Sequence, residues 1–148
     1  MNQSIHYKTS SASYDEILNH LWSCDKNHNP KLSERLDIPN YARKLLEKTV
    51  TFEAWSENHL IGLIAAYLND KEQGFITNVS VSDDHIKKGI AKTLMQHCIN
   101  DAVGKRICTL SLEVSNKNNA AINLYTKFGF KKHNQSTRSV IMRLNLKE

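Results

Sequence analysis

At 148 residues, of which 40% are hydrophobic, the chain fits one domain with its own core, and it has no run of about 18 apolar residues that could cross a membrane. Three widely spaced cysteines, with no Cys-x-x-Cys or paired-histidine motif, argue against a disulfide framework and a metal site and favour a reducing, cytoplasmic location. The net charge of +5 divides into −4 over residues 1–84 and +9 over residues 85–148, which predicts an anionic partner for the basic half.

The first half of the chain alternates predicted strands with helices. Ser13 and Glu16 fit a capping box at the start of the first helix, and Trp22 lies on its apolar face. The chain begins with no basic segment followed by an apolar one, so we expect no secretory signal. The predicted elements are a strand over 5–9, a helix over 11–27, a loop or helical turn over 31–38, a helix over 39–48, a strand over 50–55, a hairpin loop over 56–59 and a buried strand over 60–68.

The second half contains a strand–helix–strand unit followed by another helix and a closing strand. The predicted elements are a strand over 75–81, a helix opening at 87–91, a strand over 106–114, a helix capped by Asn116 or Asn118 and ended by Gly129, a short strand near Phe130 and a strand over 139–146. This order predicts a single α/β domain over residues 1–148, with one mixed, mostly antiparallel sheet and helices on both faces. The unit over 75–114 should be a parallel crossover.

The turn after the strand over 75–81 has the features of a phosphate-binding cradle. The first amide groups of a helix have no partner within it, and the helix dipole favours an anion there. Gly89 and Ala91 are small, so that a ligand can approach the backbone, and Lys87, Lys88 and Lys92 add positive charge. Taken alone, this pattern is more typical of an ordinary surface turn.

The order of elements and two motifs resemble the GNAT superfamily of acetyl-CoA-dependent N-acetyltransferases, which have the acyl-CoA N-acyltransferase fold. The family signature Gln/Arg-x-x-Gly-x-Gly/Ala corresponds to residues 86–91, with Ala91 at the last position but Ile86 at the first. A second signature, Asn-x-x-Ala-x-x-Leu-Tyr-x-x-x-Gly-Phe, is complete over residues 118–130. The spacing of Glu113, Asn118 and Tyr125 also resembles the ribosomal-protein alanine N-acetyltransferase branch, although the N-terminal half matches no motif of that branch.

The resemblance implies acetyl-CoA as the acyl donor and no metal. The backbone of Val79 and Val81 would contact the pantetheine arm, and Asn118 would contact the cofactor, unless it is only a helix cap. The pyrophosphate would be held by Lys87, Lys88, Gly89, Ile90, Ala91 and Lys92.

The resemblance also implies two catalytic residues. Tyr125 would be the general acid that protonates the leaving thiolate, and Glu113 the general base for the incoming ammonium. The alternatives are a core tyrosine and a surface carboxylate at the end of a strand. Transfer is expected to be direct in a ternary complex, because the two candidate acyl acceptors, Cys98 and Cys108, are expected to be buried.

The acceptor amine would lie near Asp25, His28, Leu32 and Arg35, although Arg35 is more typical of a surface residue. We expect an N-acetyltransferase for a small-molecule amine. The alternatives are a protein N-terminal or lysyl acetyltransferase and a non-catalytic acyl-CoA-binding module. Scattered basic residues without an aromatic array disfavour nucleic acid as a partner. We expect no membrane partner, and either a monomer or a homodimer.

Overall fold

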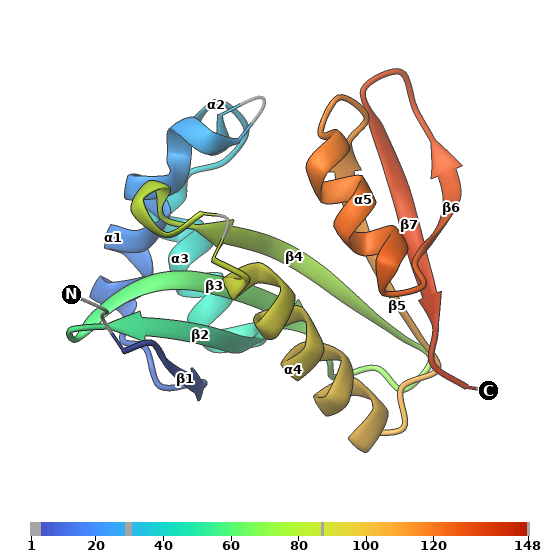
Figure 1. The fold of residues 1–148 in the computed structure, drawn as a ribbon, viewed down its shortest axis with the longest axis horizontal. Helices are drawn as coiled ribbons and strands as arrows, with labels where there is room; N and C mark the ends of the chain where they lie inside the picture. Colours follow the sequence, from blue (N-terminus) through green and yellow to red (C-terminus); the bar gives the residue numbers. More distant parts are fainter. Residues whose placement is uncertain (1–3, 29–30, 87, 148) are drawn as a thin grey trace. The chain divides into compact units, whose positions relative to one another are not determined.

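The computed structural model describes residues 4–28, 31–86 and 88–147 (Figure 1). The strands are β1 (His6–Thr9), β2 (Val50–Ser56), β3 (His59–Tyr67), β4 (Gln73–Val81), β5 (Thr109–Ser115), β6 (Lys131–Gln135) and β7 (Ser139–Asn145). The α-helices are α1 (Tyr14–Cys24), α2 (Leu32–Arg35), α3 (Ile38–Lys48), α4 (Ile90–Gly104) and α5 (Asn119–Lys127), and short 3-10 turns cover Asp25–Asn27 and Asp83–His85. Hydrogen bonds join the described strands into one sheet in the order β1-β2-β3-β4-β5-β7-β6.

The chain divides into two compact units, which are described separately. The first unit comprises residues 1–66 and 78–98, and the second comprises residues 67–77 and 99–148. Both β4 and α4 therefore contribute residues to each unit. The predicted α/β fold with one mixed sheet is confirmed, whereas a single domain over residues 1–148 stays a prediction.

Local capping explains where the helices of the first unit begin. Ser13 Oγ accepts a hydrogen bond from Glu16 N at 3.2 Å, and Glu16 Oε1 accepts one from Ser13 N at 2.9 Å, which confirms the predicted capping box. The α-helix predicted over 11–27 ends at Cys24 and continues as a 3-10 turn. Helix α3 begins at Ile38, because the Asp37 side chain caps it by accepting from Asn40 N.

The strands of the first unit are covered on both faces. On one face the core contains Trp55, Leu63 and Ala65, packed with apolar residues of α1, α2 and α3. On the other face, a Cβ added to Gly62 would come within 3.3 Å of Ile90 and Leu94 of α4. Helices therefore lie on both faces, as predicted, and every residue from 51 to 56 is buried although the sequence of β2 alternates.

Two details of the first unit differ from or refine the predictions. Trp22 is 49% exposed, so placing it on the buried face of α1 was wrong; His20 and Cys24 are buried there instead. The predicted hairpin loop is confirmed: Glu57 and Asn58 link β2 to β3, and both have positive φ angles, as a two-residue hairpin turn requires.

The parallel strand pairing of the crossover that the sequence predicts lies in the second unit. Residues 73–76 of β4 pair in parallel with residues 109–112 of β5, after the chain passes through α4. Strand β7 then pairs antiparallel with both β5 and β6, and β6 is the short strand predicted near Phe130. Gly129 has a φ of +102° and follows α5 as the predicted C-terminal cap. None of the helices in the described ranges is long and apolar enough to span a membrane.

Candidate active site

The turn between β4 and α4 in the first unit has an exposed and open backbone. Gly89 has a φ of +76°, a conformation that favours glycine, and a Cβ placed there would meet nothing within 4 Å. Its carbonyl accepts hydrogen bonds from Thr93 N and Thr93 Oγ1, both at 3.0 Å, so the helix starts directly after it. The amide groups of residues 90–92 therefore belong to the first helical turn, where they have no partner within the helix.

The predicted cofactor-binding residues around this turn differ in how far their side chains are exposed. Lys88 and Lys92 are exposed, whereas the Ile90 side chain is buried in the core, so that only its backbone could reach a ligand. Ala91 is half-buried. Lys87 lies outside the described residues. An exposed glycine with positive φ, the small Ala91 and two exposed lysines together fit an anionic group such as a pyrophosphate.

The strand that leads into this turn alternates between half-buried and buried side chains. Val79 and Val81 are half-buried, whereas Asn78 and Ser80 are buried and point to the opposite face of the strand. After the strand, Ser82 N donates to Ile61 O at 2.8 Å. Asp83 then forms an ion pair with Lys26 at 2.8 Å, and this hydrogen bond lowers the pKa of Asp83. These contacts anchor the turn to other parts of the first unit.

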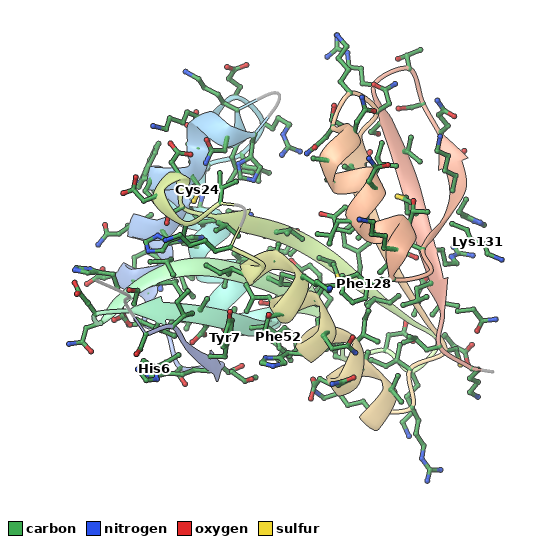
Figure 2. The ribbon with its side chains drawn as sticks, in the orientation of Figure 1. His6, Tyr7, Cys24, Phe52, Phe128 and Lys131 are labelled. Atoms are coloured by element: carbon green, nitrogen blue, oxygen red, sulfur yellow. The ribbon has the colours of Figure 1, made fainter. Side chains whose placement is uncertain are left out.

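The second signature, in the second unit, builds the ends of α5. Asn118 Oδ1 accepts a hydrogen bond from Ala121 N at 3.1 Å, which confirms the predicted cap, and Asn118 itself is exposed. At the other end, Phe130 is buried and its ring lies 6.0 Å from that of Tyr125. Phe128, labelled in Figure 2, is the last position before Gly129 reverses the chain. The signature residues thus have local structural roles, whatever they bind.

Tyr125 is a buried phenol with an unoccupied hydrogen-bonding capacity. It is 5% exposed, and burial raises its pKa to about 12. Within the described part of the chain, no protein group forms a hydrogen bond with its hydroxyl. The phenol is therefore neutral at physiological pH and retains a proton that it could donate.

Glu113 on β5 is exposed and has one defined contact. Its Oε2 accepts a hydrogen bond from Ser139 Oγ at 2.5 Å, across the pair of strands β5 and β7. A carboxylate has further lone pairs, so this contact orients the group without saturating it. Glu113 is thus available as a proton acceptor.

The structure brings three of the predicted substrate residues together in the first unit. Asp25 accepts hydrogen bonds from Ser33 Oγ at 2.6 Å and Ser33 N at 2.8 Å, which lower its pKa. Burial lowers the pKa of His28, and the charges of Arg35 and Asp25 are close enough to His28 to influence that pKa as well. Asp25 thereby holds the start of α2. The fourth residue, Leu32, is 2% exposed and belongs to the core.

Sequence reasoning missed two buried polar groups of the first unit. Glu53, fully buried on β2, accepts hydrogen bonds from Ser11 N, Ala12 N, Thr51 Oγ1 and Trp55 Nε1. His20 on α1 bonds to Leu60 O and Ser80 Oγ. Their partners lie up to 60 positions away in the chain, so no local pattern identifies them. The described residues contain no cluster of three or more His, Cys, Asp or Glu side chains that could hold a metal ion.

Comparison with known proteins places the chain in a family. Residues 14–130 match the acetyltransferase (GNAT) family, and the chain belongs to that family. It is 36% identical over 90 residues to an uncharacterized N-acetyltransferase, YsnE, of Bacillus subtilis, a match that covers 59% of this chain and 60% of the relative. The chain thus spans about three fifths of the length of the curated relatives it matches first.

Two further relatives are similar to the chain in part of the sequence or in the fold. The ribosomal protein bS18-alanine N-acetyltransferase of Escherichia coli is 34% identical over 59 residues, which cover 40% of each chain. The crystal structure of the Escherichia coli ribosomal-protein-S18-alanine N-acetyltransferase has a TM-score of 0.78 at 19% identity, covering 95% of this chain and 94% of that one. The PaiA N-acetyltransferase of Thermoplasma acidophilum, solved in complex with coenzyme A, has a TM-score of 0.75 at 17% identity, with 96% and 99% covered.

Proposed function

We propose that this chain is an acetyl-CoA-dependent N-acetyltransferase that moves an acetyl group to the primary amine of a small molecule by direct attack in a ternary complex. The observation that carries the proposal is the open Gly89 turn at the start of α4, in a chain of the GNAT family. A relative with this fold was solved with coenzyme A. The three cysteines form no disulfide among the described residues, which fits a reducing cytoplasm.

The donor would be held mainly by backbone groups. The first-turn amides of residues 90–92 would bind the pyrophosphate, with Lys88 and Lys92 adding charge, and the backbone of Val79 and Val81 would bind the pantetheine arm. Backbone recognition explains why Ile86 can replace the Gln or Arg of the family signature. Asn118 would add a contact in addition to its role as a cap.

Acetyl-CoA supplies an activated thioester. Glu113, held by Ser139, would accept the proton that the ammonium group must lose before it can attack. Tyr125, kept neutral because burial raises its pKa to about 12, would hold a proton at its hydroxyl for the departing sulfur. Asp25, His28 and Arg35 would face the acceptor. Cys98 is buried, which makes it a poor acyl carrier, whereas Cys108 is half-buried, so the expectation that it would be buried was wrong.

A protein N-terminus is the second candidate acceptor. It is favoured by the match to the bS18-alanine N-acetyltransferase and by the Glu113, Asn118 and Tyr125 spacing. The test is release of free thiol from acetyl-CoA with a panel of amino sugars, amino acids, polyamines and peptides that begin with alanine. Turnover with small amines supports the proposal, turnover with peptides alone supports the second candidate, and coenzyme A binding without turnover indicates a non-catalytic module.

A further inference from the structure

A buried polar network connects α1 to β4 in the first unit. His20 Nε2 lies 2.9 Å from Ser80 Oγ, and His20 Nδ1 lies 3.2 Å from Leu60 O. Ser80 Oγ in turn donates to Asn78 Oδ1 at 2.8 Å. His20, Ser80 and Asn78 are 3%, 6% and 4% exposed, so water cannot replace these bonds cheaply. Cys24, labelled in Figure 2, lies one helical turn after His20 and closes the network on the α1 side.

The protons of this network constrain all three residues. Leu60 O can only accept, and the Ser80 hydroxyl has a single proton, which it donates to Asn78. Satisfying every bond would therefore require an N–H on both ring nitrogens of His20. Burial opposes the charged ring and lowers its pKa to about 4. In the neutral ring only one of the two nitrogens carries a proton. His20 Nε2 and Asn78 Oδ1 then compete for the single proton of the Ser80 hydroxyl whenever Nε2 is the nitrogen without one.

Ser80 lies at a position of β4 where a small shift of the backbone would move the residues proposed to bind the acyl donor. It lies between Val79 and Val81, whose backbone is proposed to bind the acyl donor. Successive residues of a strand face opposite sides, so holding the Ser80 side chain toward α1 fixes the direction in which its two neighbours point. A slip of one residue would reverse all of them. An apolar side chain at position 20 would fill the same space, but it would form no hydrogen bond to orient the Ser80 hydroxyl.

We propose that His20 is a positioning residue for the acyl donor: through Ser80 it fixes the backbone of β4 at Val79 and Val81. This inference rests on the proposed function. An open pocket of about 160 Å³ adjoins His20 in the same unit, and we expect added imidazole to reach the space left by the ring through it. The pocket is lined by Glu16, Asn19, His20, Ser23, Asn58, His59 and Leu60.

The test measures coenzyme A binding by calorimetry in the full chain, together with the melting temperature, kcat and KM. In His20→Ala and Ser80→Ala we expect the dissociation constant for coenzyme A and the KM for acetyl-CoA to rise about tenfold, because both variants lack the buried His20–Ser80 hydrogen bond. The kcat should change by less than about threefold, since no reacting group is removed. Ser111→Ala is the matched control, because Ser111 is a buried serine on β5 that is outside this network.

Chemical rescue separates positioning from a loss of packing. Imidazole added to His20→Ala should restore the affinity for coenzyme A, whereas pyrrole, a ring of the same size with a single nitrogen, should not. Ser80→Thr keeps the hydroxyl and should retain wild-type affinity for coenzyme A. If His20→Ala does not fold, the comparison of Ser80→Thr with Ser80→Ala serves as the test. Unchanged affinity in Ser80→Ala, or equal rescue by both rings, overturns the inference. Absence of coenzyme A binding by the wild-type chain overturns the proposed function as well.

Discussion

Glu53 on β2 and Glu113 on β5 are both strand glutamates, but their surroundings are opposite. Glu53 is fully buried in the first unit and accepts from four donor groups, whereas Glu113 is exposed in the second unit and accepts from Ser139. His20 and Tyr125 repeat the contrast: the buried histidine is bonded through both ring nitrogens, and the buried phenol has a hydroxyl without a protein partner among the described residues. The comparison teaches that burial alone does not mark a candidate catalytic group; hydrogen-bonding capacity that the protein leaves unused is the better guide.

The largest effect on stability is expected from removing the saturated carboxylate. Glu53→Ala removes the acceptor of four donors, which are Ser11 N, Ala12 N, Thr51 Oγ1 and Trp55 Nε1. The substitution should therefore lower the free energy of unfolding by at least about 3 kcal/mol. Urea denaturation measures this change. Glu113→Ala is the matched control and should unfold like the wild-type chain. Similar midpoints for the two variants would remove the distinction between the two carboxylates.

The largest effect on turnover is expected from the phenol. Tyr125→Phe keeps the ring that packs against Phe130 but removes the donatable proton, so kcat should fall about 100-fold or more. The melting temperature and the affinity for coenzyme A should hardly change, because the hydroxyl has no protein partner among the described residues. Steady-state thiol release and calorimetry provide the two readouts. Wild-type turnover in this variant would make Tyr125 a core residue only.

Two of the buried titratable groups, His20 and Tyr125, predict opposite pH limits on stability. The pKa of His20 is lowered from 6.5 to about 4, so its contribution is present above pH 6.5 and is lost as the pH falls toward 4, by about 3 kcal/mol in total. The pKa of Tyr125 is raised from 10 to about 12, so its contribution is present below pH 10 and is lost as the pH rises toward 12.

These limits are measured by urea denaturation across the pH range. His20→Gln should flatten the acid limb alone, and Tyr125→Phe the alkaline limb alone. His133→Gln, which changes an exposed histidine on β6, is the control and should leave both limbs in place. An acid limb that is identical in the wild-type chain and His20→Gln would show that other groups cause it.

The smallest effects are expected at the two glycines with positive φ. Gly89→Ala meets no atom within 4 Å and should cost about 1 kcal/mol of backbone strain. Gly129→Ala has a φ of +102° and would also place its Cβ 3.2 Å from Leu144 Cδ1, so it should cost more. Only Gly89→Ala should weaken coenzyme A binding, because its methyl group projects into the open turn. Equal weakening by both variants would argue against a specific role of that turn.

Much of the fold could be predicted because its signals are local. The Ser13–Glu16 capping box, the Asn118 cap, Gly129 and the two-residue hairpin each depend on residues within a few positions of one another. The candidate residues Gly89, in the first unit, and Asn118 and Tyr125, in the second, were also identified from fixed spacings within their own motifs.

The missed features depend on contacts between distant segments. His20 rather than Trp22 is buried on α1, because Leu60 of β3 and Ser80 of β4 form hydrogen bonds with its ring. The buried Glu53 requires the segment at Ser11 to lie over β2. No periodicity in the sequence encodes either arrangement.

The most direct test of the account is a calorimetric titration of the purified wild-type chain with coenzyme A and acetyl-CoA. The account predicts saturable binding of both at one site per chain, because the open first turn of α4 recognises the diphosphate that both ligands share. Absence of saturable heat up to about 1 mM ligand, a level that detects binding of about 4 kcal/mol, would contradict it.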